Sequence, residues 1–258
     1  MNKKVKILFS EFTLMKWRNL VLTAIVCFSL IYIFAIIRTG AVADDFAAYW
    51  SVGRISIEKG FSQIYELDTL REVYSHEIKE QGYIFDLSNK TYSVPYLPVF
   101  VLPFQLLSRV ELRYSYWIWN IINLSVLFAY LIFFLQHIGS RNEASTNYLY
   151  LLVLVLISSP VIKNLASGNV NVFLLICTGE FLRNAVNNKP LLSGIWLGGL
   201  LLKPPLLILI IPLFFIKRNW DVLKGFFVSS GAILLASVFL AGFTGMKALI
   251  NLWIKYPS

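Results

Sequence analysis

The sequence predicts an all-α protein, a polytopic transmembrane helical bundle with amphipathic helices in a first extracytoplasmic loop. Of the 258 residues, 57% are hydrophobic and only 14% are charged, whereas a soluble domain carries about 25% charged residues. Apolar runs follow one another along the chain, and the mean hydropathy is +0.68. We therefore expect residues 1–258 to form a single domain in the cell membrane.

The formal charge of +9 bears on the partners of the chain. A surface that binds nucleic acid tracks the phosphates with its basic residues. Here lysines and arginines gather in short clusters beside the apolar runs, which is typical of cytoplasmic membrane anchors. We expect membrane lipids, and no nucleic acid, as partners. Cys27 and Cys177 both lie inside apolar runs, which indicates neither a disulfide nor a metal site.

The N-terminal region sets the orientation of the first span. Residues 1–19 carry five basic residues and one acidic residue, so the N-terminus is expected in the cytoplasm. A span at 20–37 then delivers residues 38–94 to the extracytoplasmic side. Within this loop, the helical spacing of 45–59 and of 68–79 predicts two amphipathic helices that lie on the membrane surface.

The remaining apolar segments define the expected spans. They lie near residues 95–108, 115–137, 148–162, 170–182, 190–202, 204–216 and 222–243. Three prolines between residues 95 and 103 disfavour a regular crossing there, so this segment either crosses or is re-entrant. The re-entrant alternative keeps Lys217 and Arg218 in the cytoplasm, as the positive-inside rule requires. It also places residues 167–171 and Lys203 on the same extracytoplasmic side as Asp45.

Asp44 and Asp45 open the long polar segment of the chain and are the candidate acids. A carboxylate at this boundary could act as a general base, and the alternative is that both residues cap the following helix. Asp44 suits the cap because it precedes the helix, whereas Asp45 suits the chemistry. The two acids could share a divalent ion, but two adjacent carboxylates alone do not indicate a metal site. The chain also contains no GxGxxG, P-loop or HExxH motif. We therefore expect no metal site and no cofactor.

Lys203 is a cation between two apolar runs without a polar loop around it. An ionisable residue in such a place is a candidate functional residue, and a lysine there could bind a phosphate or pyrophosphate at the membrane boundary. The alternative is a lysine whose apolar stem follows the helix while its amine reaches the headgroups.

Residues 167–171 form a small polar turn, and the amides of Asn169 and Asn171 could bind sugar hydroxyls. The alternative is an ordinary turn with a helix start at Asn169. Trp50, Trp117 and Trp119 could stack on sugar rings or anchor the chain at the membrane interface. His76 and His137 lack partners at ligand spacing, and we interpret both as non-catalytic.

Four features recur in a known order along residues 44–216. They are an acid followed by aromatic residues after the first span, the segment with Tyr96, Pro98, Phe100 and Pro103, a span end at Pro160 leading into Gly168-Asn169-Val170-Asn171, and the junction Lys203-Pro204-Pro205. This combination resembles the GT-C class of polytopic membrane glycosyltransferases. It is most similar to glycosyltransferase family 87, the polyprenol-phosphate-mannose-dependent mannosyltransferases of bacteria, and more distantly similar to the eukaryotic first GPI mannosyltransferase.

The resemblance implies a GT-C-like fold and an inverting transfer from a polyprenyl-phosphate sugar donor to a glycolipid or glycan acceptor on the extracytoplasmic face. It implies that Asp45 is the base, with Asp44 in support, and that Lys203 lies near the donor phosphate. The family turn of glycine-glutamine-x-asparagine matches Gly168 to Asn171, with Asn169 in place of the glutamine. Substrate contacts are expected from Tyr49, Trp50, Tyr96, Gly168, Asn169 and Asn171. The family chain continues through further spans, so this chain is expected to be C-terminally truncated.

Two other functions fit parts of the sequence. A transporter or flippase for a lipid-linked sugar would use broken helices and Lys203 as an anion site, but such proteins are often built from two corresponding halves, and none are found here. A non-catalytic subunit of another membrane enzyme is the third reading. Incubation with a labelled lipid-linked sugar discriminates between them, because only a transferase yields a new glycosidic product.

Overall fold

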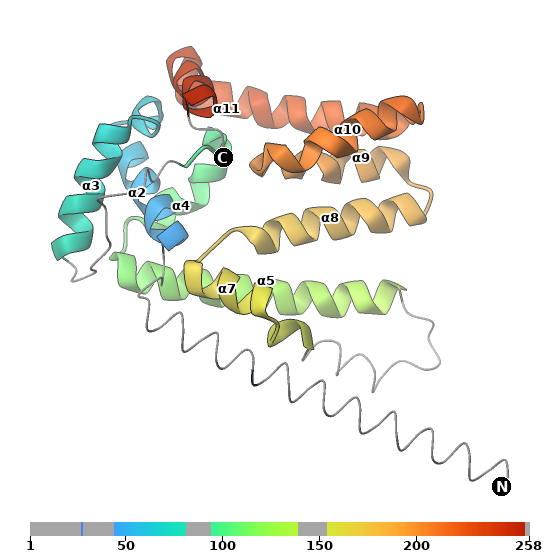
Figure 1. The fold of residues 1–258 in the computed structure, drawn as a ribbon, viewed down its shortest axis with the longest axis horizontal. Helices are drawn as coiled ribbons and strands as arrows, with labels where there is room; N and C mark the ends of the chain where they lie inside the picture. The colour runs from blue at the N-terminus through green and yellow to red at the C-terminus, as the bar shows by residue number, and fades with distance from the viewer. Residues whose placement is uncertain (1–26, 28–43, 81–93, 139–153, 256–258) are drawn as a thin grey trace, which may run out of the picture.

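The computed structural model describes residues 27, 44–80, 94–138 and 154–255, and every regular element there is a helix (Figure 1). These elements are α2 (Asp44–Glu58), η1 (Phe61–Gln63), α3 (Leu67–Glu80), η2 (Pro98–Val101), α4 (Leu102–Leu107), α5 (Leu112–Ile138), α7 (Ser159–Ser167), α8 (Asn171–Val186), α9 (Pro190–Gly198), η3 (Gly199–Leu202), η4 (Pro204–Leu206), α10 (Leu207–Ile216) and α11 (Trp220–Lys255). The all-α prediction is confirmed for this part of the chain. The expected span at 20–37 lies outside it apart from Cys27, as do residues 148–153 of another expected span.

Two helices are long and apolar enough to cross a membrane. They cover Leu112–His137 and Trp220–Ile254, and only 17% and 22% of their most apolar windows are buried. A core helix of a soluble protein would bury most of such a stretch, so the outward apolar surface supports a membrane protein. The apolar segments Pro98–Leu107, Pro190–Leu202 and Pro204–Ile216 are shorter, and each falls below the ~20 residues that a straight helical crossing needs.

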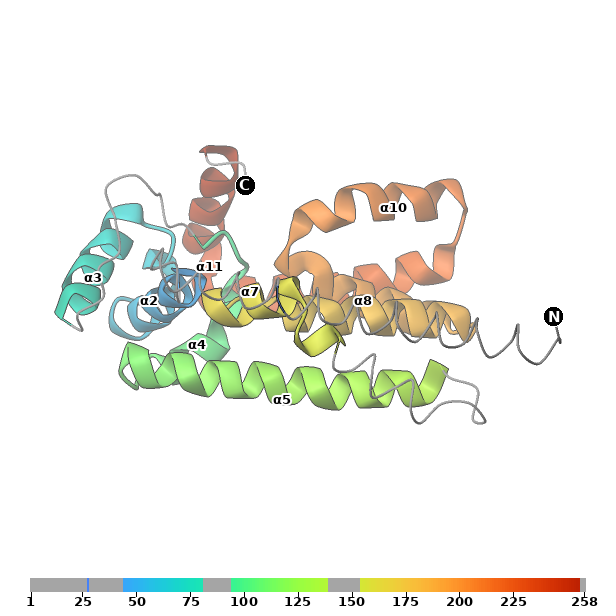
Figure 2. The ribbon, with the colours of Figure 1, turned by 60° about the horizontal axis from the view of Figure 1, so that its bottom comes forward.

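The middle of the molecule is a set of helices packed side by side. Helix α8 lies between α5 and α9, and α9 in turn packs along α11 (Figures 1 and 2). The contact between α9 and α11 is close because glycines face it. A Cβ atom on Gly194 would collide with the carbonyl of Val222, and one on Gly225 would collide with the carbonyl of Leu191. Small residues allow backbones to approach in this way in membrane helices.

Helix α11 changes direction at Gly242, whose φ of 64° and ψ of −179° are not helical. Glycine adopts a positive φ without the steric cost that a side chain brings. Residues 243–255 form a second arm, which leaves the helix layer and reaches the end of the molecule that holds α3 (Figures 1 and 2). Trp253 Nε1 on this arm donates a hydrogen bond of 2.8 Å to the carbonyl of Pro95.

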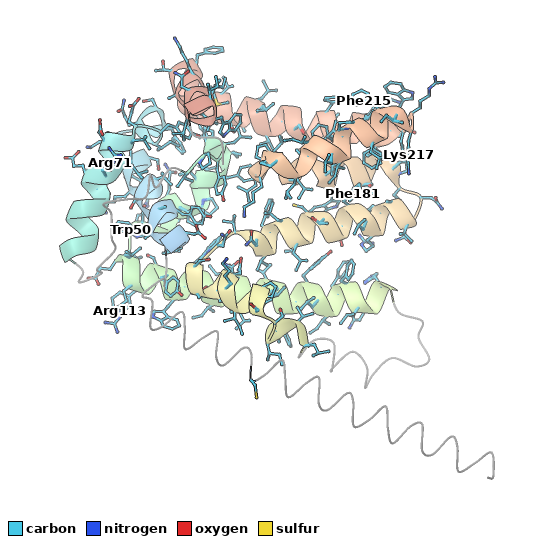
Figure 3. The ribbon with its side chains drawn as sticks, viewed as in Figure 1. Trp50, Arg71, Arg113, Phe181, Phe215 and Lys217 are labelled. Atoms are coloured by element: carbon cyan, nitrogen blue, oxygen red, sulfur yellow. The ribbon has the colours of Figure 1, made fainter. Side chains whose placement is uncertain are left out.

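Helices α2, α3 and α4 gather at one end of α5 (Figure 1). Figure 3 shows Trp50, Arg71 and Arg113 at this end, and Phe181, Phe215 and Lys217 at the opposite end. Helix α2 was expected to lie on a surface, but it is enclosed. Most residues from Phe46 to Ser56 are buried on all sides of the helix, because α3, α4, α5 and α7 surround it. The polar end therefore has a core of its own, and that core positions the candidate site.

Candidate active site

Asp45 lies in the first turn of α2, and its Oδ2 accepts a hydrogen bond of 2.7 Å from Asn169 Nδ2. The Oδ1 of Asn169 in turn accepts the backbone N–H of Val170 at 2.7 Å. This second bond fixes which end of the amide faces Asp45. The structure thus gives Asn169 a carboxylate as its partner, across 124 positions of the chain. The side chain of Asp44 lies outside the described residues.

The turn that carries Asn169 depends on Gly168. Helix α7 ends at Ser167, and Gly168 follows in the left-handed conformation with φ 68° and ψ 34°. A Cβ atom there would lie 2.5 Å from Cβ of Phe46, so the turn packs directly on α2. The Gly168 carbonyl also accepts a hydrogen bond of 2.8 Å from Trp119 Nε1 on α5. Gly168 is itself buried, and its observed contacts are with protein groups.

Lys203 lies on the other side of the same turn. It separates η3 from η4, and its Nζ donates a hydrogen bond of 2.8 Å to Asn171 Oδ1 at the start of α8. Partial burial lowers the pKa of the Lys203 amine, and the nearby charge of Asp45 acts in the opposite direction. Among the described residues, Lys203 forms no ion pair. Its charge is therefore held beside Asp45 by an amide and is not neutralised by a contacting carboxylate.

Two tyrosines complete this cluster. The hydroxyl groups of Tyr49 and Tyr96 are 3.2 Å apart, and the ring centroids are 5.6 Å apart. Burial raises the pKa of both hydroxyls, and the charge of Asp45 raises them further. Both groups therefore stay protonated; one hydroxyl donates to the other, and the second keeps its proton for a further hydrogen bond near Asp45. We refer to Asp45, Asn169, Asn171, Lys203, Tyr49 and Tyr96 as the polar cluster.

Trp50 lies apart from this cluster. Only 2% of the residue is exposed, and its Nε1 donates a hydrogen bond of 2.9 Å to the carbonyl of Val110. These contacts explain Trp50 as a residue that packs α2 against the loop before α5. Trp119 is also engaged, because its ring stacks on Phe46 at a centroid distance of 6.4 Å, whereas Trp117 is 59% exposed.

The sequence analysis missed two residues that support the turn. Asn164 is buried, and its Oδ1 accepts the backbone N–H of Asn171 at 3.2 Å. Tyr116 donates to the carbonyls of Leu165 and Ala166, at 2.9 Å each. A signal for Asn164 was present in the sequence, because this amide lies seven positions before Asn171 and next to Lys163 at the end of an apolar run. No sequence signal separates Tyr116 from the neighbouring aromatic residues.

Metal-binding side chains do not gather at the polar cluster. The described residues contain no group of three or more His, Cys, Asp or Glu side chains that could hold an ion. His137 lies at the far end of α5, where its Nδ1 is 2.7 Å from the carbonyl of Phe133. The described chemistry of the site is thus one carboxylate, one amine, two amides and two phenols.

Comparison with known families places this chemistry in context. A family model described as glycosyltransferase family 87 matches residues 92–258, which is more than half of the chain. No curated protein and no solved structure matches. The matched range includes the turn at 168–171 and Lys203, and it begins after α2. The chain therefore belongs to glycosyltransferase family 87 and is a glycosyltransferase.

Proposed function

We propose that the chain transfers a hexose, with mannose as the expected sugar, from a polyprenyl-phosphate donor to a hydroxyl of a lipid or glycan acceptor, with inversion at the anomeric carbon. The observation that carries this proposal is the single turn that holds Asp45 through Asn169 and Lys203 through Asn171. A base and a cation on two sides of one turn are what a displacement at a sugar phosphate requires.

The proposed reaction is one displacement. Asn169 engages Oδ2 of Asp45, and Oδ1 has no hydrogen-bond partner among the residues that the structure describes. Oδ1 takes the proton of the acceptor hydroxyl while the hydroxyl oxygen attacks the anomeric carbon. The bond from that carbon to the phosphate oxygen breaks, and the lipid phosphate leaves with its negative charge next to Lys203. Attack from the face opposite the leaving group inverts the configuration.

The proposed topology follows from the apolar surfaces. Helices α5 and the first arm of α11 cross the membrane with the N-terminus in the cytoplasm, and the polar cluster lies at the extracytoplasmic boundary. The segment formed by η2 and α4 has four and six residues, which favours the re-entrant alternative over a full crossing. The polyprenyl tail then lies in lipid along the outward apolar faces, while its phosphate reaches Lys203.

The test is the substitution Asp45→Asn in protein reconstituted in lipid vesicles with radiolabelled polyprenyl-phosphate mannose. We expect loss of labelled product, because an amide cannot take the acceptor proton. Asp221→Asn is the matched control, since Asp221 pairs with Lys224 at 2.9 Å at the start of α11, away from the cluster. Full transfer by the Asp45 variant at normal expression would exclude Asp45 as the base. Movement of labelled lipid across the vesicle without product would instead favour the transporter.

A further inference from the structure

A second polar hollow lies next to the polar cluster, between the α3 region and the second arm of α11. Its volume is about 510 Å³, within the range of about 300–1,000 Å³ that is usual for ligand pockets. The polar side chains that line it, besides the Tyr65 phenol, are Glu66, Asp68, Arg71, Thr244, Lys247 and Asn251. The kink at Gly242 redirects residues 243–255, so that this arm packs against η1 beside the hollow.

The polar groups of α11 in the hollow share one helix face. Thr244, Lys247 and Asn251 are spaced by three and four residues, which places them on the same side of a helix. All three are exposed, and their side chains make no hydrogen bond or ion pair within the described ranges. The same holds for the Glu66 side chain on the opposite wall. The hollow therefore presents donors and acceptors that are available to a ligand.

The charges in the hollow are balanced, and this decides the class of ligand. Asp68 and Arg71 pair with each other at 3.3 Å, which leaves one acid, Glu66, and one base, Lys247. An anionic ligand such as a phosphodiester favours a surplus of positive charge. A neutral ligand that both donates and accepts many hydrogen bonds suits a carboxylate, an amine, an amide and a hydroxyl. Saccharides have this chemistry.

The hollow is connected to the polar cluster through Pro95 and Tyr96. Tyr65 lines the hollow, and its hydroxyl donates a hydrogen bond of 2.6 Å to the Tyr96 carbonyl. Trp253 on the second arm of α11 holds the Pro95 carbonyl, and the Tyr96 hydroxyl contacts Tyr49 beside Asp45. We propose that the hollow binds the saccharide part of the acceptor and leads its hydroxyl toward Asp45, an inference that rests on the proposed function.

Binding is tested on the full chain in phosphatidylcholine nanodiscs, with linear trisaccharides of mannose, glucose or N-acetylglucosamine as probes and saturation-transfer NMR as the readout. We expect at least one trisaccharide to bind, with affinity about tenfold lower in Lys247→Ala and in Asn251→Ala, as loss of one hydrogen bond to the ligand predicts. Lys189→Ala is the matched control, because Lys189 is an exposed lysine at the α8–α9 turn. Its affinity should be unchanged.

The experiment separates this inference from the proposed function because no donor is present. Asp45→Asn should bind the trisaccharide as well as the unmodified protein does, even though it makes no product. The inference is overturned if none of the three trisaccharides binds. It is also overturned if the Lys247 and Asn251 variants bind a trisaccharide with the same affinity as the unmodified protein. Binding of glycerophosphoethanolamine that depends on Lys247 and is not displaced by a trisaccharide also overturns it, in favour of a lipid headgroup.

Discussion

A basic side chain lies at each end of helix α8, and the two side chains differ in their partners. At the C-terminal end, Arg183 binds Glu180 through Nε at 3.0 Å and through Nη2 at 2.5 Å. Its guanidinium also lies 5.4 Å from the ring centroid of Phe133. At the N-terminal end, Lys203 Nζ donates a hydrogen bond of 2.8 Å to Asn171 Oδ1 and has no carboxylate partner among the described residues. The first cation is neutralised by contact, and the second is positioned with its charge available.

This difference indicates which end of the bundle does chemistry. A charge-assisted pair between a guanidinium and a buried carboxylate on the same helix compensates the positive charge locally, and the contacts of this pair with Tyr130 and Phe133 pack α8 against α5. An amine held by a neutral amide keeps its full charge for an incoming phosphate. Arg183 and Lys203 are both basic residues at the ends of apolar helices. Their partners in the described structure distinguish them, because Arg183 belongs to a structural ion pair and Lys203 to a candidate anion site.

Of the two basic residues at the ends of α8, Lys203 should have the larger effect on transfer when it is replaced. In Lys203→Ala we expect kcat to fall about 100- to 1,000-fold, the loss found when a group that stabilises developing charge is removed. The melting temperature should stay close to that of the unmodified protein, because Lys203 contributes no ion pair between described residues. The readout is initial transfer rate at saturating donor. Transfer unaffected by Lys203→Ala would show that the available charge is not used.

Glu180→Gln should produce the opposite pattern at the other end. Glu180 is 5% exposed, and loss of its charge leaves Arg183 without a counter-ion. We expect the free energy of unfolding to fall by about 3 kcal/mol, the lower end for a broken buried pair, because the Arg183 side chain is still 21% exposed. Transfer per folded molecule should be retained. A variant of normal stability with impaired transfer would contradict the structural assignment.

Sequence reasoning singled out the charged residues of the candidate site, and the structure adds the partners of their side chains. Asp45 and Lys203 stand out in the sequence because placing a charge beside a membrane-spanning segment costs free energy, so such residues are often functional. Asn169 and Asn171 were predicted as direct substrate contacts, and in the structure each holds one of these charges. The contact between Asp45 and Asn169 joins two distant parts of the chain, and no local pattern encodes such a pairing.

The fold shows the same limit. Helical spacing predicted α2 and α3 closely, because a stripe of apolar residues is a local signal. It could not predict that α2 is enclosed, since enclosure depends on α4, α5 and α7 arriving from later in the chain. The kink of α11 was also not predicted. The sequence of α11 also contains Gly225, Gly231 and Gly245, and nothing in it marks Gly242 as the residue with φ of 64°.

Asn169 is predicted to act through Asp45, with a smaller effect than Lys203. We expect Asn169→Ala to lower kcat about 10- to 100-fold, as loss of a hydrogen bond to a charged group predicts. Donor KM should change little, because the phosphate is held at Lys203. Asn169→Gln, which keeps the amide, should recover part of the rate if its longer side chain still reaches Asp45. A change confined to KM would assign Asn169 to substrate binding instead.

The smallest expected effect is a shift in the alkaline pH dependence of donor binding. Partial burial lowers the pKa of Lys203, so its charge is lost at a lower pH than that of an ordinary lysine. Donor binding needs the charged form, and donor KM should therefore rise with pH through this lowered pKa. In Lys203→Arg the guanidinium keeps its proton throughout, and the rise should move to higher pH. The measurement is donor KM from neutral to alkaline pH for both proteins, with Arg183→Lys as the control. Because Glu180 neutralises the charge at position 183, Arg183→Lys should leave the pH dependence of donor KM unchanged. Identical pH dependence of donor KM in Lys203→Arg and in the unmodified protein would show that Lys203 does not bind the donor phosphate.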